Sequence, residues 1–279
     1  MSGQAVPVPG QPGGGCAPAS HRHGEFGHEL GRTAVPGRYC RVRRWAPCER
    51  GLFMRQWLEY RAGENAYEAL TEAAVTPTPQ PQAEAPEEPA GEAAPIQVDF
   101  DALSAVNPDV TGWIYLPDSV ISYPVVQGED NSYYLKHLFD GTPNSSGCLF
   151  LDSRCEGLTG RNSVIYGHYM KNGTLFGSLK EYRDQAYYDA HPVFYLITSE
   201  EVLTVQVFSA YIAGPEDSAW QLNFDSLEDY GAWLEELEER SCIKSAAEPE
   251  STDRVITLST CSYEFQNARF VCHGLVREE

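Results

Sequence analysis

The chain has no long apolar run and comparatively few basic residues. None of its 279 residues falls in a stretch of 18 consecutive apolar residues, so the sequence offers no candidate for a membrane-spanning helix. No apolar segment of adequate length follows the first residues, so no signal peptide is indicated. Only 20 Lys and Arg stand against 40 Asp and Glu, and the net charge of −20 argues against nucleic acid as a partner.

Paired cysteine spacings are missing from the N-terminal part of the chain. Cys16, Cys40 and Cys48 lie too far apart to form the C-x-x-C pairs of a structural zinc site. We therefore expect no metal site, and nothing in the sequence calls for another cofactor.

The charges are divided unevenly along the chain. Residues 1–61 hold nine of the basic and four of the acidic residues, a balance of +5, which leaves −25 for the remainder. Residues 1–51 are rich in Gly, Pro and Arg and show no sustained period of 2 or 3.6. We interpret them as disordered, or as a non-native stretch read from a wrong start or across a frameshift.

Two segments of contrasting composition follow. In residues 52–75, apolar side chains are spread among Glu, Arg and Ala, which predicts a helix. Residues 76–95 contain six Pro and four Glu and predict an extended linker. We therefore expect a folded domain over residues 96–279, carried on a helix that serves as a juxtamembrane stalk.

Short strands dominate the predicted structure of residues 96–279. Eight runs have the β-branched and aromatic character of strands: Gly112–Leu116, Ile121–Val126, Cys148–Leu151, Ser163–Tyr166, Val193–Thr198, Val202–Ile212, Arg254–Thr260 and Arg269–Val276. Helices are predicted at Asp130–Phe139, Leu175–Tyr182 and Leu227–Arg240, the last capped by Asp225. Eight strands with helices inserted between them favour a mainly β fold, a closed barrel rather than a βαβ sheet.

Three reactive residues fall at the ends of predicted strands. Cys261 ends a β-branched run, Arg269 opens the next run, and His168 follows a third. A neighbouring histidine or guanidinium supports the thiolate form of a cysteine, which makes it a nucleophile. The histidine can also carry protons and the guanidinium can stabilise an oxyanion. The pattern predicts a nucleophile, a proton shuttle and an oxyanion donor in one cleft.

Several motifs together resemble a class B sortase. They occur in order over roughly residues 100–279 and are Gly112–Ile114, Tyr123–Gln127, Tyr166–Met170 and Val255–Cys261 followed by Arg269–Val271. The resemblance implies an eight-stranded β-barrel preceded by a helix, and it implies a cysteine transpeptidase. Such an enzyme cuts a sorting motif in a secreted protein, holds the acyl fragment as a thioester, and passes it to an amine on a cell-wall precursor or a pilin.

The resemblance also assigns roles to residues. Cys261 matches the nucleophile, His168 the general acid and base, and Arg269 the oxyanion-stabilising arginine. Positions that line the substrate groove correspond to Tyr166, Ser259, Asn131 and Leu135, and Leu222–Leu237 resembles an insert that forms one groove wall.

Two features depart from the class B pattern. Some members have a carboxylate where Ser262 follows the cysteine, and the membrane anchor expected ahead of the 52–75 helix is missing. We expect the enzyme to act on the extracellular face of the cytoplasmic membrane of a Gram-positive bacterium, held by an anchor that is not visible in this sequence.

Other cysteines and histidines are given structural roles. Small buried side chains are the usual role of strand cysteines, and this is expected of Cys148, Cys242 and Cys272. A Cys148–Cys155 disulfide is not expected. His273 lies inside the last strand and is assigned to packing, whereas two histidines in turn contexts are expected to be exposed, namely His137 and His191.

Two charged residues compete for roles in the site. Arg254 begins the cysteine strand, which places it ~20 Å from Cys261. Asp152 is the only candidate to orient His168, and a surface role is preferred for it.

Other functions remain open at this point. A pilin-polymerising sortase or a plain cysteine endopeptidase would share these residues. A non-catalytic surface protein, as an inactive relative, is a further alternative. A sorted substrate protein is excluded, because its sorting motif would lie near the C-terminus before an apolar tail, whereas Leu116–Ser119 lies far from Glu279. The sorting motif and the acceptor amine cannot be read from the sequence.

Overall fold

The structure, a computed structural model, describes residues 47–78, 95–261 and 267–277. Most of the 1–51 segment that was interpreted as disordered, and most of the predicted linker, lie outside these ranges. Helix α1 (Pro47–Ala74) begins five residues before the predicted start. It is followed by the short antiparallel pair of β1 (Val75–Pro77) and β2 (Ile96–Val98).

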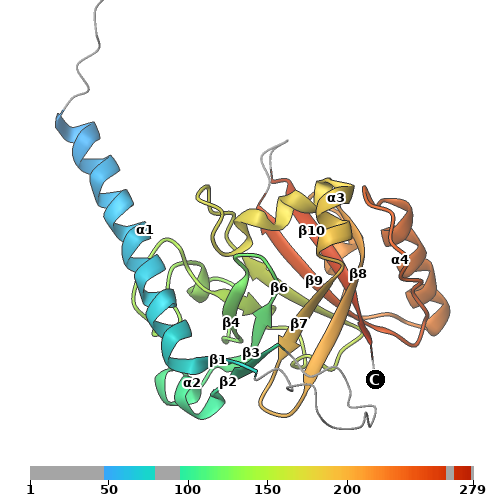
Figure 1. The fold of residues 1–279 in the computed structure, drawn as a ribbon. Coiled ribbons are helices and arrows are strands. Elements are labelled where there is room, and N and C mark those ends of the chain that lie inside the picture. The colour runs from blue at the N-terminus through green and yellow to red at the C-terminus, as the bar shows by residue number, and fades with distance from the viewer. Residues whose placement is uncertain (1–46, 79–94, 262–266, 278–279) are drawn as a thin grey trace, which may run out of the picture. The chain divides into compact units, whose positions relative to one another are not determined.

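Eight further strands close into one barrel (Figure 1), which confirms the predicted fold class. Around the barrel the order is β10-β8-β7-β3-β4-β5-β6-β9, with parallel pairs at β4–β5 and β6–β9. The strands are β3 (Val110–Tyr115), β4 (Ser122–Val126), β5 (Leu149–Leu151), β6 (Asn162–Gly167), β7 (Val193–Ile197), β8 (Val202–Ala213), β9 (Arg254–Cys261) and β10 (Arg269–Arg277). Alternate side chains of these strands fill the interior, and Trp113, Phe194 and Phe270 are almost fully buried there.

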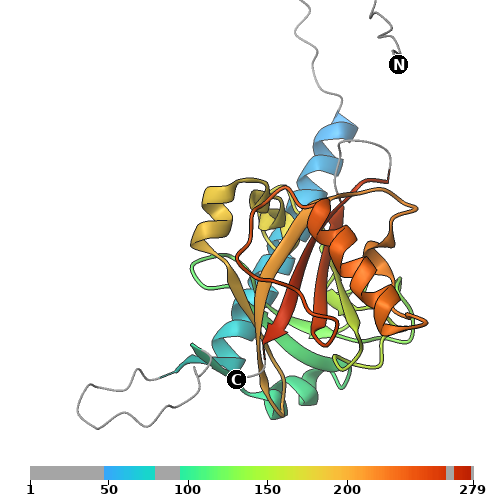
Figure 2. The same ribbon diagram turned by 90° about the vertical axis from the view of Figure 1, so that its right-hand side faces the viewer.

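Helix α4 (Leu227–Glu239) covers the barrel side formed by β8, β9 and β10 (Figures 1 and 2). Of the predicted apolar stripe, Tyr230, Leu234 and Leu237 are buried, whereas Leu227 is exposed at the first turn and Trp233 is buried although it was not predicted to be. The cap is Ser226 rather than the predicted Asp225. The extended backbone of Ser226 lets its hydroxyl accept a hydrogen bond of 3.0 Å from the Asp229 amide, whereas Asp225 lies one residue too early.

The other two predicted helices were assigned the wrong form. Residues 130–139 contain only the 3-10 turn η1 (Tyr133–Leu135), because the Asp130 carboxylate accepts hydrogen bonds from Ser132 and Tyr133 and closes a tight turn. The helix predicted at 175–182 is the 3-10 helix η2 (Phe176–Arg183). Three short helices were not predicted, namely α2 (Phe100–Val106), α3 (Gln185–Ala190) and η3 (Ser218–Trp220), and neither were the short strands β1 and β2.

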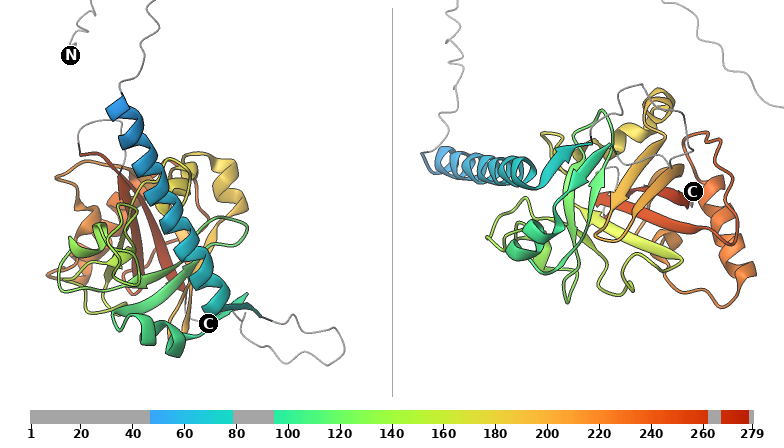
Figure 3. Two further views of the ribbon diagram at one scale, coloured as in Figure 1. Left: turned by 90° about the vertical axis from the view of Figure 1, so that its left-hand side faces the viewer. Right: turned by 60° about the horizontal axis from the view of Figure 1, so that its bottom comes forward.

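Helix α1 packs against the barrel (Figure 3) instead of standing apart from it. Tyr67 and Ala74 are buried, and the ring of Tyr67 meets that of Tyr123 on β4 edge to face at 5.4 Å. Helix α1 and the barrel belong to one compact unit. Within the described residues, no helix has both the length and the apolar character needed to span a membrane.

Candidate active site

The pairing of three strands brings the three predicted catalytic positions to one end of the barrel. In the antiparallel β9–β10 pair, Cys261 lies directly opposite Arg269. In the parallel β6–β9 pair, Gly167 lies opposite Thr260, so His168 leaves β6 beside the end of the cysteine strand. The side chain of Cys261 lies outside the described part of the chain, and its position is given by its backbone alone.

A cavity of about 250 Å³ opens at this end of the barrel. His168 and Arg269 both line it, together with the four residues expected to bind substrate, Asn131, Leu135, Tyr166 and Ser259. The structure thus gathers all of these predicted residues around one space. Phe150, Gly167 and Thr260 line it as well and were not predicted, because their apolar or small side chains have the character of ordinary strand residues.

The His168 ring is half-buried and is held by a main-chain oxygen. Its Nε2 lies 2.8 Å from the carbonyl oxygen of Leu135. Because a carbonyl only accepts, Nε2 carries a proton in this contact and Nδ1 is left to exchange one. A histidine held in this way can serve as an acid and a base without a carboxylate partner.

Arg269 is half-buried at the start of β10, and its Nη1 donates to the Ala268 carbonyl over 3.1 Å. That bond uses one of the five guanidinium donors. A guanidinium at the rim of the cavity can provide charge-assisted hydrogen bonds to an oxyanion inside it.

Asp152 is buried, so the surface role preferred for it is wrong. Its carboxylate accepts bonds from Arg154 at 2.7 and 2.9 Å and from the Tyr166 hydroxyl at 3.0 Å. Burial by itself would raise the pKa of Asp152, but the bonds from Arg154, Asn131 and Tyr166 outweigh it and lower the pKa to about 2. Asp152 therefore carries its charge at neutral pH and fixes Tyr166 in the wall of the cavity.

Ser259 is held from the segment that precedes α4. The indole Nε1 of Trp220 donates to its hydroxyl oxygen over 3.0 Å, and Ser259 is almost fully buried. The prediction that the stretch from Leu222 onward forms a wall of the groove missed Trp220, which lies two residues earlier. No sequence signal marks this contact, because it joins η3 to β9 across the barrel surface.

His273 has the packing role that was predicted for it. Its Nδ1 lies 2.9 Å from the hydroxyl of Thr257, which itself donates to Asn162, and its ring stacks against Tyr211. Burial, followed by the charge of Arg240, lowers the pKa of His273 to about 3, so the ring is neutral in the folded protein.

The remaining cysteines differ in exposure. Cys148 and Cys272 are buried as predicted, and burial raises the pKa of Cys148 to about 12 and that of Cys272 further still. The prediction for Cys242 was wrong, since this thiol is exposed just beyond α4. Cys155 is half-buried and, as expected, forms no disulfide with Cys148.

The two histidines expected to be exposed are half-buried. His137 stacks on Tyr133 at 4.0 Å between ring centres, and Nδ1 of His191 lies 3.1 Å from the Pro117 carbonyl. Both lie outside the cavity lining, as does Arg254, which occupies the opposite end of β9 from Cys261.

Comparison with known proteins agrees with this fold. The family model described as "Sortase domain" matches residues 114–276. Sortase B of Staphylococcus aureus (strain NCTC 8325 / PS 47) is 33% identical over 167 residues, which make up 60% of this chain and 68% of that protein.

Solved structures of sortase B are also similar. A Staphylococcus aureus sortase B–substrate complex has a TM-score of 0.61 and 31% identity, and the match covers 64% of this chain and 84% of that one. Sortase B from Bacillus anthracis in complex with AAEK1 has a TM-score of 0.66 and 30% identity, with coverage of 80% and 100%. The chain belongs to the sortase family of cysteine transpeptidases, and its relatives are class B enzymes.

Proposed function

We propose that this sortase cleaves a sorting motif in secreted proteins with Cys261 as nucleophile, His168 as general acid and base, and Arg269 as oxyanion donor. The observation that carries the proposal is the strand register. It sets Cys261 opposite Arg269 and beside the strand that leads into His168. The side chains of Arg269 and His168 both line the cavity at this end of the barrel.

Acylation begins when the Cys261 thiolate attacks the carbonyl carbon of the scissile peptide bond. The negative charge that develops on the carbonyl oxygen is stabilised by hydrogen bonds from the Arg269 guanidinium. The C–N bond then breaks, His168 gives its proton to the departing amine, and the acyl fragment remains on Cys261 as a thioester.

Transfer reverses these roles. His168, now neutral, takes a proton from an incoming amine, whose nitrogen attacks the thioester carbonyl. The thiolate of Cys261 leaves and a new amide forms. One histidine serves both half-reactions because each needs one proton moved between the same ring and an amine nitrogen.

Asn131, Leu135, Tyr166 and Ser259 form the walls that hold the sorting motif. This assignment is supported by their position around the cavity, where Asp152 fixes Tyr166 and Trp220 holds Ser259. A solved structure of Staphylococcus aureus sortase B is a complex with its substrate, and for this chain we take sorting-motif peptides as the substrates to test.

The acceptor is an amine on a cell-wall precursor or a pilin, and the enzyme works on the outer face of a Gram-positive cytoplasmic membrane. In this arrangement α1 lies between an anchor and the barrel. Cell fractionation, with mass spectrometry of the native N-terminus, tests the location. Native protein that begins at Met1 and is recovered free of membranes would contradict it.

The activity test uses the full chain with a panel of sorting-motif peptides. Cleavage should require Cys261, and an added amine should divert the product from the acid to the amide. We expect Cys261→Ala to abolish the acyl-enzyme seen by mass spectrometry. His168→Ala should be nearly as damaging, because the amine cannot leave unprotonated at neutral pH.

The same experiment separates the alternatives. A plain cysteine endopeptidase would give only the acid at every amine concentration. A pilin-polymerising enzyme would prefer a lysine side chain presented by a folded protein over a short peptide amine. Cleavage that persists in Cys261→Ala would refute the proposal.

A further inference from the structure

Helix α1 holds the loop of residues 144–147 at two points. At the first, the side-chain amide of Asn144 donates to the main-chain oxygen of Glu59, and the main-chain amide of Ser145 donates to the Glu59 carboxylate. Both bonds are 2.9 Å long. At the second, the buried hydroxyl of Tyr67 donates to the Gly147 carbonyl over 2.6 Å. Burial raises the pKa of Tyr67 well above its ordinary value, so this hydroxyl keeps its proton.

The same loop lies against the ring of His168. A β-carbon at Gly147, where φ is +62°, would lie 3.1 Å from Cδ2 of His168 and 3.0 Å from the carbonyl oxygen of Leu135. That oxygen is the one that accepts the hydrogen bond from His168 Nε2. Only a glycine fits between these groups, so the position of the Gly147 main chain and that of the histidine ring depend on each other.

Main-chain bonds tie the loop to η1, which carries Leu135. The main-chain amide of Cys148 donates to the Tyr134 carbonyl, and the main-chain amide of Asn144 donates to the Lys136 carbonyl, each over 2.9 Å. A shift of Gly147 is therefore passed to the Leu135 carbonyl as well as to the ring edge of His168.

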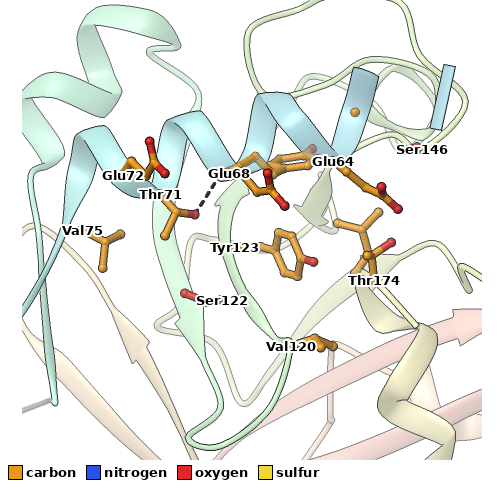
Figure 4. Close-up of a pocket in the computed structure, with 13 residues that line it drawn as sticks. Glu64, Glu68, Thr71, Glu72, Val75, Val120, Ser122, Tyr123, Ser146 and Thr174 are labelled. Atoms are coloured by element: carbon orange, nitrogen blue, oxygen red, sulfur yellow. Dashed lines mark hydrogen bonds between the residues drawn. The ribbon is translucent and has the colours of Figure 1, made fainter. Parts of the chain in front are cut away.

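Tyr67 lies between two open grooves. One, of about 490 Å³, separates α1 from β4 and carries Glu64, Glu68 and Glu72 on its helix side (Figure 4). The other, of about 350 Å³, lies toward Leu138 and Phe139. Tyr67 is itself buried between them, and its hydrogen bond to the Gly147 carbonyl is one of the contacts that fix the helix to the loop.

We propose that Tyr67 is a positioning residue for His168 and acts through the Gly147 carbonyl. Helix α1 then helps to hold the active site in its geometry through the loop of residues 144–147. This inference rests on the proposed role of His168. It adds a residue that lies outside the sortase domain match of 114–276.

The test is Tyr67→Phe in the full chain, which keeps the ring and removes the hydroxyl. Loss of one buried hydrogen bond should lower kcat for peptide cleavage on the order of fivefold, with little change in KM, because substrate does not touch Tyr67. The imidazole ¹H–¹⁵N signals of His168, assigned by their loss in His168→Gln, should move at constant pH. Glu59→Ala removes the other side-chain contact and should act in the same direction.

The matched control is Tyr60→Phe on the same helix. Its hydroxyl accepts a hydrogen bond from Gln56, which lies on α1 itself, so neither kcat nor the His168 signals should change. Unchanged kcat and unchanged His168 signals in Tyr67→Phe and Glu59→Ala would overturn the inference, as would equal effects from Tyr60→Phe. If the unsubstituted chain cleaves no peptide, the proposed function fails, and the NMR comparison still decides whether Tyr67 positions His168.

Discussion

The Tyr166 hydroxyl donates a 3.0 Å hydrogen bond to Oδ2 of Asp152, a carboxylate whose side chain is completely buried. Tyr166 lines the cavity from β6, while Asp152 follows β5, so the bond joins two neighbouring strands at the wall of the proposed active site. Burial and the Asp152 charge both raise the pKa of Tyr166, which keeps the phenol protonated as a donor. Through this contact Asp152 supports the wall of the proposed active site.

Replacing Asp152 by Asn should lower the free energy of unfolding by about 2 kcal/mol at pH 7, estimated from the shift of the Asp152 pKa from 3.8 to about 2. A carboxylate with a lowered folded-state pKa stabilises the protein above its unfolded pKa, and this contribution is lost as pH falls. The difference between the two proteins should therefore shrink between about pH 4 and pH 2. Urea unfolding at several pH values measures it, with the exposed Asp189→Asn as control.

His273 should make the free energy of unfolding depend on pH at higher pH values than Asp152 does. Its folded-state pKa of about 3 lies below the ordinary 6.5, so the unfolded state binds the additional proton in between. Stability should be lost as pH falls from 6.5 toward 3, by up to ~1.4 kcal/mol for each pH unit. His273→Gln, which keeps a hydrogen-bonding group beside Thr257, should flatten the unfolding free energy over this range. An identical pH dependence in both proteins would mean that His273 is not buried in the neutral form.

Arg269→Lys should slow the enzyme while leaving the charge in place. Lysine lacks the planar fork of donors, so we expect a loss on the order of 2–4 kcal/mol of transition-state stabilisation, measured as a fall in kcat/KM. The control is Arg254→Lys at the other end of β9, which should retain activity. Full activity in Arg269→Lys would remove the arginine from the oxyanion role.

Cys272→Ala should leave turnover nearly intact, although it leaves a small cavity beneath β10. Its thiol is fully buried and burial raises its pKa, so it neither reaches substrate nor forms a thiolate. Equal loss of activity from Cys272→Ala and Cys261→Ala, with both proteins folded by circular dichroism, would contradict the choice of nucleophile.

The strands were predicted within a few residues because each depends on its own sequence. β-branched and aromatic runs such as Val202–Ala213 have strand character wherever they lie in a fold. The Leu227–Glu239 helix was predicted for the same reason, since its apolar stripe repeats over several turns. The region around η1 failed because a single carboxylate, that of Asp130, closed a turn in place of a helix.

The contacts of the site could not be predicted in this way. These contacts depend on which segments pack together once the barrel has closed. Examples are the burial of Asp152, the hydrogen bond from Trp220 to Ser259 and the exposure of Cys242. The spacing of these residues along the chain carries no information about which segments pack together.

By itself, the sequence determined the mainly β fold class and the chemical types at the strand ends: a thiol at Cys261, an imidazole at His168 and a guanidinium at Arg269. Only the tertiary structure decided that β6 lies parallel to β9, which brings His168 to the cysteine strand, and that α1 reaches the loop of residues 144–147 through Tyr67. The physical reason is that strand and helix formation follow local propensity and periodicity, whereas strand order and helix docking are set by long-range hydrogen bonds and burial when the whole barrel closes.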